Sequence, residues 1–352
     1  MRWLIALALL LLAPSARAQD EVAYQSYNVA GGGGASWQGF SPTWIPGLAL
    51  WLRADLGVTA VAGPVTATGT TPPTVTLAGT PTAAQTSAAT PYVELDCTTL
   101  GALGTSKYAV KVNGATTATN VASAASGVVL TGSGLTAGWA VGASATNDVY
   151  TSNVVASAWA DLSGLAHNFA QATAGNRMTV ASASASNSLP MLYSATSGTQ
   201  QIADASFPTL TVPFWYAAVT SFSSNSPGGN QYLVDFSGGN VDSLLQLAGV
   251  QGVQQRGGNS TAAPGQPAAF LAEVLNNAAT TSGVAVNGST YTNVSSNAFV
   301  SSTTGGMCIG GTCVTANGWT GGVQAVIVAT IPPDAGARAR LHAYASNVFG
   351  TN

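Results

Sequence analysis

The stretch Leu48-Ala-Leu-Trp-Leu-Arg53 is the first place in this sequence where a regular pattern of side chains appears. Its leucines alternate with Ala49, Trp51 and Arg53, and a period of two residues puts alternate side chains on opposite faces of a β-strand. The stretch therefore predicts a strand, and Asp55-Leu-Gly57 after it predicts a turn.

Short runs of the same kind follow along the rest of the chain, separated by Gly, Pro, Asn and Ser. Asn113-Gly114 and Asn287-Gly288 are strong hairpin signals. One helix is expected at the end, where Pro332-Pro333 begins it, Asp334 lies in its first turn, and apolar residues follow at three- and four-residue spacing. The pattern predicts an all-β jelly-roll sandwich with a C-terminal helix. Beyond residue 160, strands are expected at 190–194, 210–219, 230–236, 243–248, 268–275, 283–287, 306–309 and 323–330.

The N-terminal end has the pattern of a secretory signal peptide. Met1-Arg2 is followed by an apolar run over residues 3–12, too short for the roughly 20 residues of a membrane-spanning helix, and Ala16-Arg-Ala18 matches a signal peptidase site. Residues 1–18 are therefore expected to be removed, which makes the protein secreted (extracellular, periplasmic or surface-associated). The alternative is an uncleaved anchor. A flexible N-terminal arm is predicted over residues 19–42, and no later segment suggests a membrane span.

Charge is scarce in this chain. Only 6% of residues are charged and 46% are hydrophobic, whereas a disordered chain would be rich in charge and poor in apolar residues. Loss of Arg2 and Arg17 with the signal peptide leaves seven basic and twelve acidic residues, a formal net charge of −5. This balance argues against nucleic-acid binding, which needs clustered cations.

Several motifs, in this order, resemble those of laminin G-like, concanavalin A-like lectin domains of bacterial or phage type. They are Leu48–Asp55, Trp159–Thr173, Gly283–Gly288, Cys308–Gly311, Trp319–Val328 and the closing helix with Tyr344 and Phe349-Gly350. The resemblance covers residues 42–58 and 154–350. It implies a two-sheet jelly roll, often a carbohydrate-binding or adhesive module.

The segment between the first two motifs has a different composition and is rich in Thr, Ala and Gly. We predict a concanavalin A-like sandwich over 43–59 and 154–352, interrupted by an inserted β domain over 60–153. Parts of the insert resemble a small β module of phage structural proteins, namely Gly101–Thr105, Thr131–Thr136 and Asp148–Tyr150.

No catalytic centre is predicted. Glycosidases of this fold carry Glu-x-Asp-x-x-Glu on one strand, and Glu94-Leu-Asp96 begins that pattern, but Thr99 replaces the second glutamate. The two histidines, His167 and His342, are expected to pack or to bond locally, since no serine-nucleophile motif accompanies them.

Calcium is the one cofactor that the sequence suggests. Laminin G-like domains often bind it through Asp and Asn oxygens, and the candidates here are Asp235, Asn240 and Asp242; a plain Gly-rich turn is the alternative. Asp161 is expected to stabilise a turn. Cys308 and Cys313 flank a Gly-Gly turn and are compatible with a disulfide, while Cys97 is expected to be buried.

Two functions remain open from the sequence. The first is a secreted, non-catalytic carbohydrate-binding or adhesion module, with Trp215, Tyr232, Arg256 and Trp319 as candidate ligand-binding residues. The second is a structural surface protein, such as a phage or prophage tail or decoration component, that uses its β domains for assembly. The expected partner is a glycan or another surface protein, and a homo-oligomer is compatible with either function.

Overall fold

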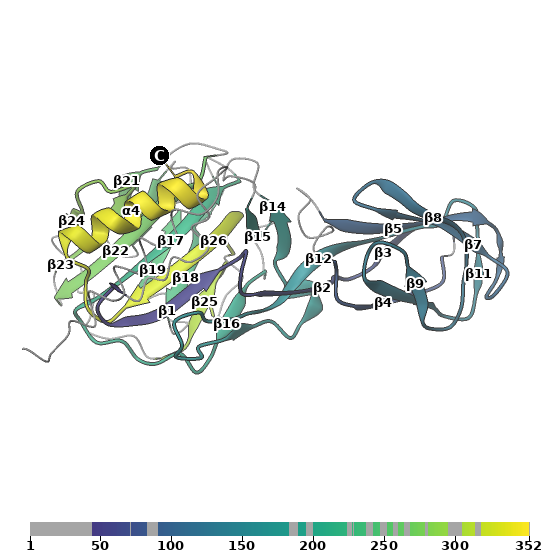
Figure 1. The fold of residues 1–352 in the computed structure, drawn as a ribbon, viewed down its shortest axis with the longest axis horizontal. Helices are drawn as coiled ribbons and strands as arrows, with labels where there is room; N and C mark the ends of the chain where they lie inside the picture. Colours follow the sequence, from purple (N-terminus) through teal and green to yellow (C-terminus); the bar gives the residue numbers. More distant parts are fainter. Residues whose placement is uncertain are drawn as a thin grey trace, which may run out of the picture. The chain divides into compact units, whose positions relative to one another are not determined.

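The protein is described by a computed structural model, shown in Figure 1. The described residues are 44–70, 72–82, 91–182, 189–194, 200–223, 227, 229–236, 242–246, 252–255, 260–263, 268–278, 281–294, 305–313 and 318–351. The predicted signal peptide and flexible arm lie outside these residues. Ile45–Asn352 forms one compact unit.

One antiparallel sheet is built on two central strands, β26 (Gly321–Ala329) and β17 (Phe214–Phe222), which pair along most of their lengths (Figure 1). The free edge of β26 pairs with β1 and β15 in succession, β15 pairs with β14, and β22, β23 and β24 continue from β17. We call this the helix-covered sheet. The bounds of these strands are Leu48–Arg53 (β1), Thr179–Ser182 (β14), Pro190–Ser194 (β15), Phe270–Ala278 (β22), Thr281–Val286 (β23) and Thr292–Val294 (β24).

The second sheet runs antiparallel through β2, β12, β13, β16, β25, β18, β19, β20 and β21. A pairing between β12 and β14 links it to the helix-covered sheet. The bounds are Val58–Ala62 (β2), Val149–Trp159 (β12), Phe169–Ala170 (β13), Ile202–Asp204 (β16), Gln231–Phe236 (β18), Asp242–Gln246 (β19), Gly252–Gln255 (β20), Ser260–Ala262 (β21) and Met307–Ile309 (β25).

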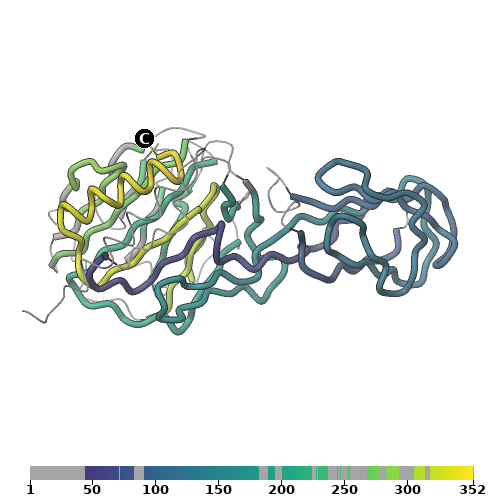
Figure 2. The backbone as a smooth tube through the Cα atoms, viewed as in Figure 1, coloured from purple at the N-terminus to yellow at the C-terminus, as the bar shows by residue number. Residues whose placement is uncertain are grey.

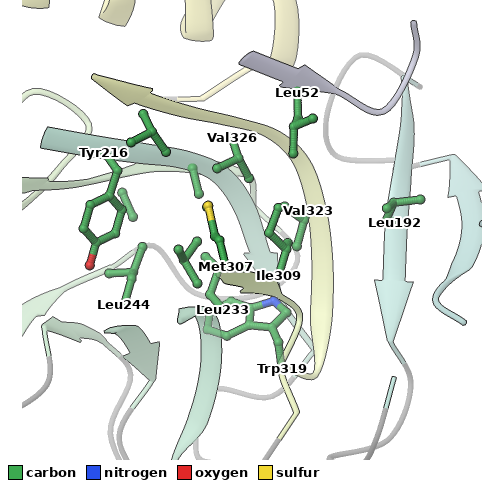
Figure 3. Packing of buried hydrophobic residues seen from close by; sticks show 14 of the residues in the cluster. Leu52, Leu192, Tyr216, Leu233, Leu244, Met307, Ile309, Trp319, Val323 and Val326 are labelled. Atoms are coloured by element: carbon green, nitrogen blue, oxygen red, sulfur yellow. The ribbon is translucent and has the colours of Figure 1, made fainter. Parts of the chain in front are cut away.

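The two sheets enclose one hydrophobic core. Figure 3 shows Leu52 and Val326 of the helix-covered sheet pointing toward Leu233 and Ile309 of the second sheet. The ring of Tyr216 meets that of Phe236 edge-on, with centroids 5.2 Å apart, so the sheets interlock through aromatic contacts.

The helix α4 (Ala335–Phe349) covers the outward face of the first sheet (Figure 1). Asp334 is its N-cap and accepts a 2.7 Å hydrogen bond from the Ala337 N–H, so this residue precedes the first turn that the sequence analysis assigned to it. The helix ends at Gly350, whose φ of 69° provides the left-handed cap. Its buried face comprises Ala337, Leu341, Tyr344, Ala345, Val348 and Phe349.

Residues 60–153 contain a second hydrophobic cluster, with Tyr108 and Trp139 in ring contact at 4.9 Å and Cys97 buried and free, as predicted. Asn113-Gly114 forms the predicted two-residue hairpin turn, with φ angles of 51° and 83°. Figure 2 traces this part in blue. Its strands are Thr66–Thr68 (β3), Val75–Gly79 (β4), Tyr92–Thr99 (β5), Gly101–Ala102 (β6), Lys107–Val112 (β7), Ala115–Ala122 (β8), Val128–Leu130 (β9), Leu135–Trp139 (β10) and Ala143–Ser144 (β11).

The all-β class, the sandwich and the C-terminal helix that the sequence predicts are confirmed. The strand predicted from residue 210 begins only at Phe214, directly after Pro213, whose nitrogen carries no hydrogen to donate to the sheet. The domain boundaries and the concanavalin A-like type stay predictions. No helix in the described residues is long and apolar enough to span a membrane.

Candidate functional site

The aromatic residues predicted to bind a ligand lie in the interior. Trp215 and Trp319 have no exposed surface, and Tyr232 is only 5% exposed. Trp319 packs against Phe222 in the sandwich core, with ring centroids 5.4 Å apart. A ring buried on both faces cannot stack on a sugar, so we reassign these three side chains to packing roles. Arg256 lies outside the described residues.

The predicted calcium ligands are only partly described. Asp235 is fully buried, and its Oδ2 accepts a 3.2 Å hydrogen bond from the Cys313 N–H. Asp242 begins β19, where its backbone alone is described, and Asn240 lies outside the described residues. The described part of the chain contains no group of three or more His, Cys, Asp or Glu able to hold a metal ion. Calcium binding at 235–242 therefore stays a prediction.

Cys308 and Cys313 form a disulfide. Cys308 is opposite Asp235 in the register of β25 and β18, so the disulfide and the Asp235 carboxylate hold the same loop. Gly310 adds a 2.8 Å bond from its N–H to the carbonyl of Leu233. By sequence the cysteine pair and Asp235 are separate features, whereas the fold brings them together in one loop anchor.

Replacing both cysteines of this anchor by serine is expected to lower the free energy of unfolding by about 2 kcal/mol, because the bond closes only a short loop. Urea unfolding of the variant and of the oxidised protein measures the difference. Cys97→Ser, which leaves the disulfide intact, is the control for placing a serine hydroxyl at a buried cysteine position. An unchanged midpoint in the double variant would show that the loop is held by its hydrogen bonds alone.

Asp161 has the turn-forming role predicted for it. Its two carboxylate oxygens accept hydrogen bonds from the main-chain N–H groups of Trp51 (3.1 Å), Ser163 (2.8 Å) and His167 (3.1 Å), and from the Ser163 hydroxyl (2.7 Å). These donors tie the loop after β12 to strand β1. The Asp161 carboxylate is thus engaged in fixing the backbone.

Glu94 and Asp96, the carboxylates that begin the glycosidase pattern, share one lysine. Lys111 lies opposite Glu94 on the neighbouring strand, with 2.7 Å between its Nζ and Glu94 Oε1, and it also contacts Asp96 Oδ2. Hydrogen bonds to Asp96 and Glu94 raise the pKa of Lys111 above its ordinary value. Both carboxylates therefore neutralise a cation on the face of β5.

His342 belongs to a polar cluster between α4 and the helix-covered sheet. Glu273, on β22, is fully buried and accepts bonds from Arg338 Nε (2.8 Å) and Nη2 (3.0 Å) and from His342 Nε2 (2.6 Å). The Tyr291 hydroxyl donates to the same carboxylate at 3.2 Å and accepts a 2.9 Å bond from Trp215 Nε1. The Arg338 guanidinium stacks on the Tyr291 ring, 4.2 Å from its centroid.

These contacts set the charge state of the cluster, which we call the Glu273 clamp (Glu273, Arg338, His342, Tyr291 and Trp215). Burial raises the pKa of Glu273, but the hydrogen bonds and charges of His342 and Arg338 outweigh burial, and the net pKa is lowered. Burial, with the Glu273 charge, raises the pKa of Tyr291, so its hydroxyl stays a donor. The clamp is a closed, satisfied network that fastens the helix to the sheet.

Few aromatic rings reach the surface in the described part of the chain. Trp44, Tyr92, Tyr193 and Tyr291 are partly exposed, and the other described aromatic residues are buried. Tyr291 belongs to the Glu273 clamp and has a guanidinium on its ring, and Tyr92 lies on β5, which contributes to the second hydrophobic cluster. Among the described strand tyrosines of the sandwich, Tyr216 and Tyr232 are buried, and Tyr193 on β15 is partly exposed.

Tyr193 lies in a row of small and hydroxyl-bearing residues across four strands. It is opposite Thr179 on β14 and Gly322 on β26, and Gly322 is opposite Ser221 on β17. The Met191 thioether and the Ser221 hydroxyl both lie over the Cα of Gly322, where a Cβ would be 2.2 Å from the sulfur and 3.1 Å from the oxygen. We call this surface (Thr179, Met191, Tyr193, Ser221 and Gly322) the tyrosine face.

The tyrosine face is on the outward side of the helix-covered sheet. Leu192 and Val323 point into the core, so their neighbours Tyr193 and Gly322 point away from it. The alternation Met191-Leu192-Tyr193 was the available sequence signal for an outward tyrosine. It was missed because sequence alone does not show which outward residues α4 covers: Trp215 lies on the same side but is buried.

Comparisons with known proteins give distant likenesses. No family model and no curated protein matches this chain. Among solved structures, a Trypanosoma rangeli sialidase in complex with sialic acid matches with a TM-score of 0.35 and 13% identity, over 53% of this chain and 31% of that chain. The Ruminococcus gnavus IT-sialidase CBM40 bound to alpha2,3 sialyllactose matches with a TM-score of 0.28 and 16% identity, over 37% of this chain and 82% of that one. This chain thus spans about a third of the sialidase, and likeness at these TM-scores supports no conclusion about function.

Proposed function

We propose that this chain is a secreted, non-catalytic module that binds glycans through the tyrosine face. The observation that carries the proposal is the partly exposed ring of Tyr193 on an outward sheet face, beside the hydroxyl-bearing Thr179 and Ser221. The export signal predicted from residues 1–18 and the predicted concanavalin A-like type of the sandwich support the same function. No observation in the described residues favours the alternative of a phage structural protein.

A sugar ring has an apolar face of C–H groups and a rim of hydroxyls, and an aromatic side chain beside hydrogen-bonding groups complements both. Tyr193 offers the aromatic surface. The hydroxyls of Thr179 and Ser221 have no hydrogen-bond partner within the described part of the chain, so both are available to a ligand. Gly322 lies between Tyr193 and Ser221, and the Met191 sulfur occupies the space above its Cα, so an apolar thioether lines the surface between the aromatic ring and the Ser221 hydroxyl.

Tyr193→Ala is expected to weaken glycan binding at least about fivefold, since stacking on an aromatic ring contributes on the order of 1 kcal/mol or more. A glycan array identifies the ligand of the mature protein, and calorimetry measures its Kd for the variant. Tyr92→Ala removes a partly exposed tyrosine from β5 of the insert and is the matched control, expected to leave Kd unchanged. An array without any bound glycan, or equal losses in the two variants, would overturn the proposal.

A further inference from the structure

The strands that form the tyrosine face come from parts of the sequence without any charge. Residues 178–203 contain β14 and β15, residues 205–234 contain β17, and residues 274–333 contain β26, and none of these stretches includes Asp, Glu, Lys, Arg or His. The tyrosine face is thus built entirely from uncharged residues.

Five charged residues border these stretches, and two of them, Asp235 and Asp334, accept from the Cys313 and Ala337 N–H groups as described above. Arg177 donates from Nε to the Gln171 carbonyl at 2.9 Å and from Nη2 to the Ala172 carbonyl at 3.1 Å. Asp204 accepts from the Ser206 N–H at 2.8 Å and from its hydroxyl at 2.6 Å. Glu273 is enclosed in its clamp. The other carboxylate oxygen of Asp204 lies 3.5 Å from His167 Nδ1, so all three charges are directed toward groups outside the tyrosine face.

A charged group on a ligand would meet no oppositely charged side chain on such a surface. The carboxylate of an acidic sugar loses hydration on binding and needs an Arg or Lys in return, and calcium needs several oxygen ligands that normally include carboxylates. Hydroxyl groups need neither, because neutral donors and acceptors satisfy them. The chemistry of the tyrosine face therefore selects against charge on the ligand and against a bridging metal ion.

We infer that the ligand of the tyrosine face is an uncharged sugar, bound without a metal ion. This inference rests on the proposed function and narrows its ligand to one class. Calcium, if it binds at 235–242, would then act on stability and not on sugar recognition.

The test compares neutral and acidic glycans on the purified mature protein, with EDTA and salt as further variables. On the array, binding is expected only for glycans that present a neutral hexose. Addition of a terminal sialic acid to such a glycan is expected not to increase its binding. The Kd for the best neutral oligosaccharide is expected to stay within about twofold in EDTA, and within about twofold between ~0.05 and ~0.5 M NaCl, because no charge pair is formed.

The outcomes separate the two claims. The first outcome is that binding requires an acidic sugar, or is abolished by EDTA, and is also lost in Tyr193→Ala. That result overturns this inference and leaves the proposed function standing. Binding to neutral sugars that Tyr193→Ala does not affect overturns both, because the ligand then lies elsewhere. Absence of binding to any glycan rejects the proposed function and this inference with it.

Discussion

Replacement of Glu273 by alanine is expected to lower the free energy of unfolding by about 3–5 kcal/mol, the usual cost of removing one partner from a buried ion pair. The Glu273 carboxylate is fully buried and accepts from Arg338, His342 and Tyr291, so its loss leaves three polar groups at the helix–sheet contact without their acceptor. We expect α4 to exchange its amide hydrogens faster than the sheet beneath it. Urea unfolding and hydrogen exchange measure the two effects.

Glu94→Ala is the matched control, because Glu94 also pairs with a cation but is partly exposed. Its loss is expected to cost less than about 1 kcal/mol. If Glu273→Ala and Glu94→Ala lowered the free energy of unfolding equally, the stabilising role assigned to the Glu273 clamp would be contradicted. A Glu273→Met, Arg338→Met double variant is expected to recover part of the loss, since apolar groups of similar size can replace a buried pair.

The Glu273 clamp also determines whether the stability of the fold rises or falls with pH. The pKa of Glu273 is lowered in the folded state, so its contribution to stability is complete above the unfolded-state pKa of about 4.3 and is lost as pH falls through the folded-state value. Unfolding midpoints measured from neutral to acidic pH are therefore expected to converge for the native protein and Glu273→Gln at the acid end. A constant difference across that range would contradict this assignment.

Local pattern was enough to predict the fold class. The alternation of Leu50 and Leu52 with Trp51 and Arg53 predicts the strand β1, and Asn113-Gly114 predicts a hairpin that has the expected positive φ angles. Each of these signals is local, because it depends on a side-chain period or on the conformational preference of one turn.

The candidate site depends on contacts distant in sequence, and there the local signals fail. Trp215 and Tyr193 both point outward from one sheet, yet Trp215 is buried and bonded to Tyr291, and Tyr193 is partly exposed. The clamp was missed for the same reason. Glu273 is the one charged residue between Arg256 and Asp334, which indicates that it needs a partner, but only the packing of α4 shows that Arg338 and His342 supply it.

Gly321→Ala tests the end of the central strand β26 that carries part of the tyrosine face, and it is expected to lower the free energy of unfolding by about 3 kcal/mol, at the upper end of overpacking effects. A Cβ at Gly321 would be 2.0 Å from the carbonyl oxygen of Ser221 and 2.8 Å from Trp319 Nε1, and the residue has a φ of 151°. Because the nearest clash is with main-chain atoms of β17, the substitution forces the ends of β17 and β26 apart instead of moving a flexible side chain.

Gly229→Ala is the control for Gly321→Ala, because a Cβ there meets no described atom within 4 Å and its φ is not positive. Its free energy of unfolding is expected to change by no more than about 0.5 kcal/mol. Ser221 and Gly322 belong to the separated strand ends, so Gly321→Ala is also expected to weaken glycan binding in a protein that is still folded at low temperature. Full stability together with full binding in this variant would show that β17 and β26 do not pair at this end, and the tyrosine face would then have to be rebuilt from other residues.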